Sequence, residues 1–211
     1  MFRVLAYLSP MAVGFGVAAA LALTEGASPK RRALAAGGVL GAAVAILAVA
    51  ALSESFRAFA KVSVILASFS ALVAGLYLLG EACRLPREIT QVGACLVVVA
   101  LVSSVFWMGP FIREAADVDP GGQATYRRIS FALAVNPYIV MGYSVFGFEP
   151  LHSDALLPLG LHDYQFGRPG WGSTSSGYAL FGLLCFGASR GLTALRRRRS
   201  PAPLSPSSRP S

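Results

Sequence analysis

The sequence predicts an all-α protein, a polytopic bundle of about six transmembrane helices. Hydrophobic residues make up 55% of the 211 residues and charged residues only 13%, and the mean hydropathy is +0.62. A soluble domain carries about 25% charged residues, because its surface has to be solvated by water. The charges also leave six apolar runs of about 20 residues, the length at which a helix crosses the hydrocarbon of a bilayer. We therefore expect the outer surface to face lipid.

The first run covers residues 4–24 and is interrupted only by Pro10. Arg3 before the run and the small residues at 18–20 would also suit a signal peptide. The length of the run and the further runs behind it favour an uncleaved first helix.

The second and third runs cover residues 33–52 and 62–80. The second is almost wholly Ala, Gly, Val and Leu, and Gly37 and Gly41 stand four residues apart in it. Small residues at this spacing let helix backbones approach closely in lipid. The third run adds three serines, whose hydroxyls can bond to the preceding turn or to a neighbouring helix. Both runs predict spanning helices that pack against others.

The fourth run covers residues 92–112 and has Trp107 and Pro110 near its end. Tryptophan at that position is typical of the aromatic belt at the membrane interface. Residues 113–128 then hold six charged side chains and a Pro-Gly-Gly sequence at 120–122. This composition predicts a water-exposed loop.

The fifth run covers residues 129–148 and contains Asn136-Pro137 in its middle. Proline removes a helical hydrogen bond and clashes with the preceding turn, so the run predicts a kinked span. A short helix at the interface is the alternative, and it would leave five spans. A broken helix could free backbone groups to line a cavity, but a kink capped by Asn136 is the favoured interpretation.

The last run, residues 171–189, follows an outer loop at 149–170 and precedes the four arginines at 196–199. Residues 196–211 are predicted to be a basic and then Pro/Ser-rich disordered tail, which leaves residues 1–195 as the membrane domain. Basic residues near span ends are retained in the cytoplasm. The arginine run therefore predicts an integral protein of a cytoplasmic (inner or plasma) membrane, with its C-terminus in the cytoplasm.

The side on which the N-terminus lies depends on the number of spans. Six spans place it in the cytoplasm, whereas five spans place it outside. The basic residues of the remaining loops divide almost evenly in both versions. Arg3 and the length of the fifth run favour six spans.

Candidate residues for chemistry gather in the outer loop, which holds both histidines of the chain, His152 and His162, with Asp154 and Asp163 beside them. Such His and Asp pairs could supply metal ligands or an acid–base couple. Their spacing matches no closed metal site, so a structured loop whose polar groups bond to backbone and water is the favoured interpretation.

Other classes of function find no support in the sequence. The apolar runs contain no ionisable Asp, Glu, Lys, Arg or His, which argues against proton-coupled transport through buried carboxylates. No phosphate-cradling loop, metalloprotease motif or nucleophile motif is present, so no cofactor, metal or catalytic residue is predicted. The net charge of +8 flanks apolar runs and forms no stripe of the kind that binds nucleic acid.

The last third of the chain resembles the end of the permease subunits of type-2 ABC exporters. The resemblance rests on Asn136-Pro137, the outer loop before the last span, and a final helix that ends in Leu195 and the arginines at 196–199. It implies a dimeric permease half that pairs with a cytoplasmic ATP-binding subunit. The basic amphipathic helix that precedes the first span of such permeases is not found here.

Three hypotheses for function follow. The favoured one is a non-enzymatic subunit or scaffold of a membrane complex, because the helices carry small-residue faces and no buried charge. Its partners would be the lipid bilayer and other membrane subunits or further copies of the chain. The alternatives are a transport permease driven by a separate ATPase subunit and a membrane enzyme that uses the His/Asp loop.

Overall fold

The structure, a computed structural model, describes residues 1–51, 55–118, 123–148 and 169–199, and every regular element in these ranges is helical. The predicted all-α class is therefore confirmed. The elements are α1 (Phe2–Leu23), α2 (Pro29–Ala50), α3 (Phe56–Ala82), α4 (Arg87–Val102), α5 (Ser104–Val118), α6 (Gln123–Ala134), α7 (Pro137–Met141), the π-helix η2 (Gly142–Phe146) and α8 (Trp171–Arg199).

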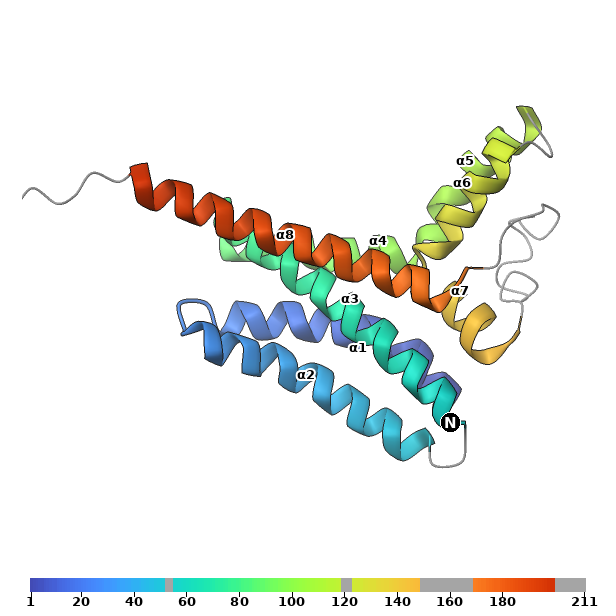
Figure 1. Cartoon of the computed structure of the whole chain (residues 1–211), viewed down its shortest axis with the longest axis horizontal. Helices are drawn as coiled ribbons and strands as arrows, with labels where there is room; N and C mark the ends of the chain where they lie inside the picture. Colours follow the sequence, from blue (N-terminus) through green and yellow to red (C-terminus); the bar gives the residue numbers. More distant parts are fainter. Residues whose placement is uncertain (52–54, 119–122, 149–168, 200–211) are drawn as a thin grey trace, which may run out of the picture.

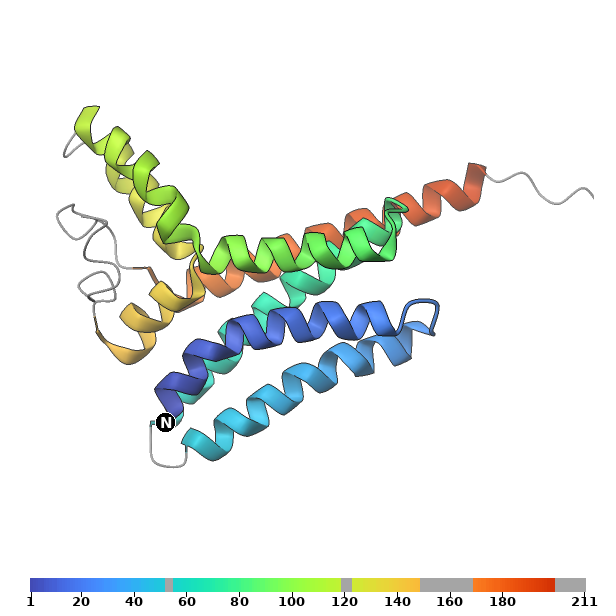
Figure 2. The same cartoon turned by 180° about the vertical axis from the view of Figure 1, so that it is seen from behind.

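Four of these helices, α1, α2, α3 and α8, are long and apolar enough to cross a membrane. The number rises to six if the bent pairs α4 with α5 and α6 with α7 each count as one span. In Figures 1 and 2, α1 to α4 and α8 run along the long axis of the molecule as a bundle. The chain is thus a multi-pass helical membrane protein.

Helix α3 lies at the centre of the bundle and packs against α1, α4 and α8. Its largest fully buried side chains are Phe69 and Tyr77. It crosses α8 at two glycines. A Cβ atom on Gly75 would lie 2.4 Å from the carbonyl oxygen of Gly182, closer than such atoms can stand. Only glycine allows the two backbones to meet there.

Helix α2 lies at the edge of the bundle and packs mainly on α1. In the most apolar 18 residues of α2, only 6% of the window is buried inside the protein, whereas the figure for α3 is 56%. Gly37, Gly38 and Gly41 are exposed, and a Cβ atom on any of them would meet nothing within 4 Å. The small-residue pair Gly37 and Gly41 therefore makes no helix contact within the described chain.

The predictions for residues 92–128 were partly wrong. The fourth run is broken at Ser103, where α4 and α5 meet at a bend of 63°. The predicted loop is helical through residue 118 and again from residue 123, and α5 packs against α6 as a hairpin that projects from the bundle (Figure 1).

The charged residues of the predicted loop are compatible with a helical hairpin, because the two helices bury apolar side chains against each other and leave charged ones on the outside. The inner face includes Val105, Ile129 and Leu133, whereas Arg127 and Arg128 are exposed. The Pro-Gly-Gly sequence at 120–122 lies outside the described residues.

The fifth run is kinked at Asn136-Pro137, as predicted, but the bend between α6 and α7 reaches 93°. The last helix is longer than predicted, since α8 continues through the arginine run to Arg199. The predicted tail from residue 200 and most of the predicted outer loop, residues 149–168, lie outside the described residues.

Three segments meet at one end of the bundle, which we call the basic end: residues 24–34, 81–90 and 187–199. Arg32 bonds to Glu81 there, Arg87 pairs with Glu25, and the Arg196 guanidinium donates to the carbonyl of Ala82.

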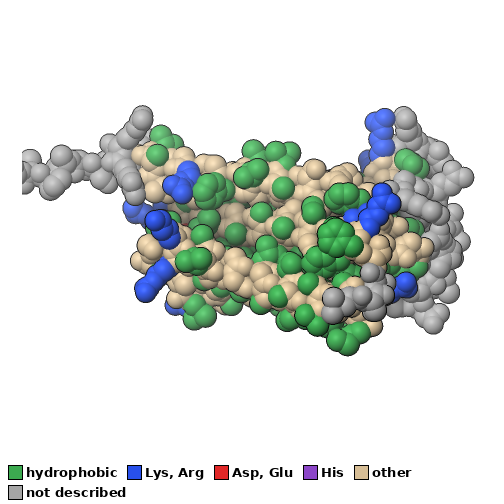
Figure 3. All heavy atoms as spheres, turned by 60° about the horizontal axis from the view of Figure 1, so that its bottom comes forward, with side chains coloured by type: hydrophobic (Ala, Val, Ile, Leu, Met, Phe, Trp, Pro, Cys, Tyr) green, Lys and Arg blue, Asp and Glu red, His purple; other side chains and the backbone are tan. Residues whose placement is uncertain are grey.

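The starts of α1 and α3 meet η2 at the opposite end. The rings of Phe2 and Phe146 lie 6.0 Å apart, and Lys61 Nζ donates to the Ser144 carbonyl at 2.7 Å. The start of α1 and the end of α8 therefore lie at opposite ends of the bundle (Figure 2). In Figure 3, Lys and Arg side chains gather at the two ends and hydrophobic ones cover the middle.

Candidate functional site

The two broken helices meet at a polar junction that is organised by Asn136. This side chain is 2% exposed. Its Oδ1 accepts hydrogen bonds from the backbone amides of Tyr138 (2.9 Å) and Ile139 (3.2 Å), which caps α7. Its Nδ2 donates to the carbonyl of Val102 (2.8 Å) and to the hydroxyl of Ser104 (3.2 Å) on either side of the other break. One amide therefore satisfies backbone groups at both breaks.

Helix α8 supplies the bonds for the carbonyls that the second break leaves free. Thr174 Oγ1 donates to the carbonyl of Ala134 at 2.9 Å, and the Tyr178 hydroxyl donates to the carbonyl of Val135 at 2.7 Å. Both side chains are buried. Because unpaired backbone groups are costly in lipid, these two bonds stabilise the bend and tie it to α8.

Carbonyls at the first break also accept bonds from side chains close to it in the sequence. The indole Nε1 of Trp107 donates to the carbonyl of Ala100 at 2.8 Å, and the Ser103 hydroxyl donates to the carbonyl of Val99 at 2.7 Å. The backbone groups named at both breaks thus all have partners within the chain. We call this junction, residues 102–104 and 134–139, the corner.

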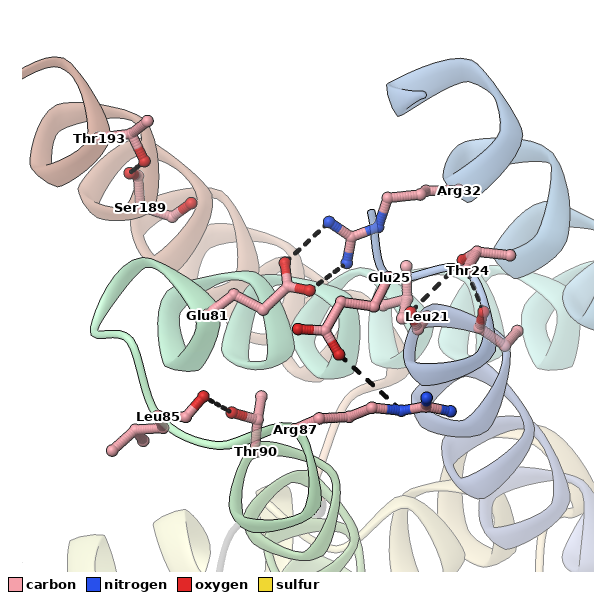
Figure 4. A network of polar contacts seen from close by, with 11 residues as sticks. Leu21, Thr24, Glu25, Arg32, Glu81, Leu85, Arg87, Thr90, Ser189 and Thr193 are labelled. Carbon is pink, nitrogen blue, oxygen red and sulfur yellow. Dashed lines mark hydrogen bonds and ion pairs between the residues drawn. The ribbon is translucent and has the colours of Figure 1, made fainter. Parts of the chain in front are cut away.

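A second polar cluster lies at the basic end (Figure 4). Arg32 on α2 forms a two-pronged ion pair with Glu81 at the end of α3, with both N–O distances at 2.8 Å. The two side chains are 17% and 20% exposed. Since a bidentate pair is among the stronger polar contacts, it clamps the start of α2 to the end of α3.

The neighbouring ion pair is looser. Arg87 Nε lies 3.8 Å from a carboxylate oxygen of Glu25, and both side chains are 43% exposed (Figure 4). The hydroxyl of Tyr77, which is fully buried on α3, has no hydrogen-bond partner among the described residues. The cluster fixes helix ends to one another and presents no pair of groups arranged for acid–base chemistry.

Aromatic rings line the opposite end. Tyr7 lies within 6.0 Å, between ring centroids, of Tyr138, Phe146 and Phe148, and the Arg3 guanidinium stands 5.8 Å from the centre of the Phe146 ring. This packing fastens η2 to the start of α1. These ring contacts hold residues 138–148, which connect the bend at Asn136 to the predicted outer loop.

The predicted site residues fall into two groups. Asn136 and Pro137 lie at the corner as expected. His152, Asp154, His162 and Asp163 lie outside the described residues, so their role as ligands or catalysts stays a prediction. Across the part of the chain that the structure describes, no three His, Cys, Asp or Glu side chains stand close enough to hold a metal ion.

Sequence reasoning missed the side chains that bond to Asn136 and to the two residues before it. Ser104 accepts from Asn136, and Thr174 and Tyr178 donate to the carbonyls of Ala134 and Val135. These pairs are 32 to 43 positions apart in the sequence, so no local pattern identifies them. The polar start of the last apolar run, Ser173 to Ser176, was the available signal, because hydroxyls are enriched where membrane helices bond across an interface.

No protein-family model, no curated protein and no solved structure matches the chain.

Proposed function

We propose that this chain is a non-enzymatic subunit or scaffold of a membrane complex and that the free face of α2 is where it joins its partner. The observation that carries the proposal is the set of three exposed glycines, Gly37, Gly38 and Gly41, on a helix that is almost unburied. The proposed partner is a membrane helix of another subunit or of a second copy.

These glycines lower the stability of α2 unless another helix packs against them. Each one destabilises a helix by about 0.5–1 kcal/mol relative to alanine. Elsewhere in the chain Gly75 and Gly182 offset this cost, because they let α3 and α8 touch backbone to backbone. The same gain on α2 requires a helix that this chain does not supply among its described residues.

The corner supports a structural role over a transport path. Asn136, Thr174 and Tyr178 bond to the backbone groups that the breaks expose. Transport sites in broken helices use such groups to hold the ion or substrate. At this corner the carbonyls of Val102, Ala134 and Val135 are instead bonded to side chains of the same protein, which suits a fixed shape.

The test is purification of the full-length tagged protein in mild detergent, with co-eluting proteins identified by mass spectrometry. The variant G37L/G41L fills the free face of α2 and is expected to lose the partner. The matched control is Gly93→Leu, an exposed helical glycine on α4 with equally open surroundings. Unchanged recovery of the partner with G37L/G41L would contradict the proposal.

A second candidate is a permease subunit driven by a separate ATP-binding subunit. Two broken helices that meet at one junction favour it, because discontinuous helices recur in transporters, and the resemblance to ABC exporters points the same way. This hypothesis predicts a stoichiometric ATPase in the purified complex. ATP hydrolysis that co-elutes with the chain would place the permease ahead of the scaffold.

We also propose that the chain crosses a cytoplasmic (inner or plasma) membrane five times, with the basic end in the cytoplasm. Helices α1, α2, α3 and α8 each carry the chain between the two ends of the bundle. The fifth crossing is made by α4, which is long enough to span only when the start of α5 is counted with it. Basic residues near span ends are retained in the cytoplasm, so α8 ends there and α1 begins outside. The hairpin of α5 and α6 belongs to the outer side.

A further inference from the structure

The positive charge of the molecule is concentrated at the basic end. Of the 18 basic residues, ten lie in the three segments 24–34, 81–90 and 187–199, one is Arg209, and seven lie elsewhere. Of the ten acidic residues, three lie in these segments and seven lie elsewhere. Outside this end and the tail the charges therefore cancel, and the net charge comes from one place.

Part of this charge is used within the protein. Arg32 pairs with Glu81, Arg87 with Glu25, and Arg196 bonds to the carbonyl of Ala82. The Arg190 guanidinium stacks 5.0 Å from the ring centre of Phe186. These four side chains hold helix ends together or lie on their own helix.

Three further basic side chains at this end make no such contact. Lys30, Arg31 and Arg84 are exposed and make no ion pair or side-chain hydrogen bond with the described residues. Lys30 and Arg31 also stand in the first turn of α2, where no acidic residue is present. A helix N-terminus favours negative charge, so the two cations are unfavourable there unless an anion joins them.

Arg84 occupies a backbone position that suits glycine. Its φ is +60°, in the left-handed region. The Arg84 amide donates to the carbonyl of Glu81 and the Leu85 amide to that of Gly80, which is the capping pattern that ends many helices with a glycine. An arginine there strains the turn, but it adds a basic residue between the end of α3, where Glu81 binds Arg32 of α2, and the start of α4.

The surface around these three residues is apolar. Leu23, Leu34, Leu85 and Ile89 are between 47% and 78% exposed. A soluble anion would gain nothing from them. A phospholipid would, because its phosphate meets the cations while its acyl chains cover the leucines and the isoleucine next to them.

We propose that Lys30, Arg31 and Arg84 form a binding surface for the phosphate groups of anionic phospholipids in the leaflet at the basic end. The ligand class is an anionic glycerophospholipid. The bound lipid would neutralise the first turn of α2 and bridge it to the α3–α4 turn, beside the clamp made by Arg32 and Glu81.

The test compares the melting temperature of the full-length protein in neutral detergent with added dioleoylphosphatidylglycerol or dioleoylphosphatidylcholine. The wild-type protein is expected to melt higher with the anionic lipid. K30A/R31A/R84A should lose that shift, with an apparent affinity about fivefold weaker for each basic residue removed. The matched control R57A/R127A/R128A removes three exposed arginines elsewhere and should keep the shift.

The single variant Arg84→Gly separates binding from folding. It relieves the left-handed backbone, so it should melt at or above the wild-type temperature without lipid and respond less to phosphatidylglycerol. Equal responses of the two triple variants, or equal shifts with both lipids, would overturn the proposal. A shift of the same size with inorganic phosphate would overturn it too, by assigning the surface to a soluble anion.

Discussion

Asn136 stabilises the corner of the molecule with a single side chain. Its carbonyl oxygen caps α7 and its amide nitrogen reaches the carbonyl of Val102, 34 positions away in the sequence. Aspartate or serine would cap a helix as well. An ionised aspartate has no donor, however, and serine has a single short hydroxyl, whereas the amide offers its oxygen to the cap and its separate NH₂ group to the other break.

Replacing Asn136 therefore tests the two halves of this side chain separately. Asn136→Ala leaves the backbone groups at both breaks unpaired and is expected to lower the free energy of unfolding by about 2–3 kcal/mol. Asn136→Ser keeps a capping oxygen and should lose only about 1 kcal/mol. Unfolding in mixed detergent micelles measures both values. Equal losses would mean that the cap contributes nothing.

The two ion pairs at the basic end differ in burial, and their contributions to stability should differ accordingly. The Arg32–Glu81 pair is bidentate and mostly buried, whereas the Arg87–Glu25 pair is long and exposed. Glu81→Ala leaves a buried guanidinium unpaired and should cost about 2 kcal/mol, while Glu25→Ala should cost less than about 1 kcal/mol.

A double-mutant cycle with Arg32→Ala separates pairing from the packing of the side chains. The R32A/E81A double variant should cost less than the sum of the two single variants, because no charge is then left buried without its partner. Additive losses would show that the two side chains act independently.

At the scale of helices, glycines decide which surfaces meet. Gly75→Ala would bring a Cβ atom to 2.4 Å from the Gly182 carbonyl, so α3 and α8 would have to separate. We expect a loss of about 2 kcal/mol or more in the free energy of unfolding, as in other overpacked contacts.

Gly41→Ala is the control on α2, where the added methyl group meets open space. It should be neutral or stabilise the isolated chain by about 0.5 kcal/mol. Thermal melting of the two purified variants compares them. A loss for Gly41→Ala that matches Gly75→Ala would mean that α2 packs more tightly than its open surroundings indicate.

The helices that the sequence predicted well are those set by length and apolarity. The first three runs and the last one became α1, α2, α3 and α8, because about 20 apolar residues have one stable form in lipid. The kink at Asn136-Pro137 was also predicted, since proline acts on its own helix.

What the sequence left out depends on contacts between distant residues. The break at Ser103 has no proline beside it, and Pro110, expected near the end of a span, lies inside α5. The break is stabilised by Asn136 from another helix. The hairpin was mistaken for a loop because its charges are dense, although its inner face is apolar. The break at Ser103 does not follow from a local pattern. For the hairpin, the helical spacing of Ile129, Ala132 and Leu133 was a local signal.

The whole molecule has two unlike ends, and this asymmetry makes a prediction about its orientation. The basic end holds the net positive charge, whereas the start of α1 lies at the other end. Five crossings with the C-terminus in the cytoplasm place the α3–α4 turn in the cytoplasm. Six crossings with the same C-terminus place that turn outside, so its position distinguishes the two versions.

Cys83 in this turn is a natural reporter, because it is exposed, whereas Cys95 is partly covered and Cys185 is buried. A membrane-impermeant maleimide added to intact cells should leave Cys83 unlabelled, and labelling should appear only after the membrane is opened. In the variant C83S/R57C, the new cysteine at the opposite end should label in intact cells. The reverse pattern at both positions would exclude the five-span orientation and place the α3–α4 turn at the outer surface. The anionic lipid surface would then have to bind the outer leaflet.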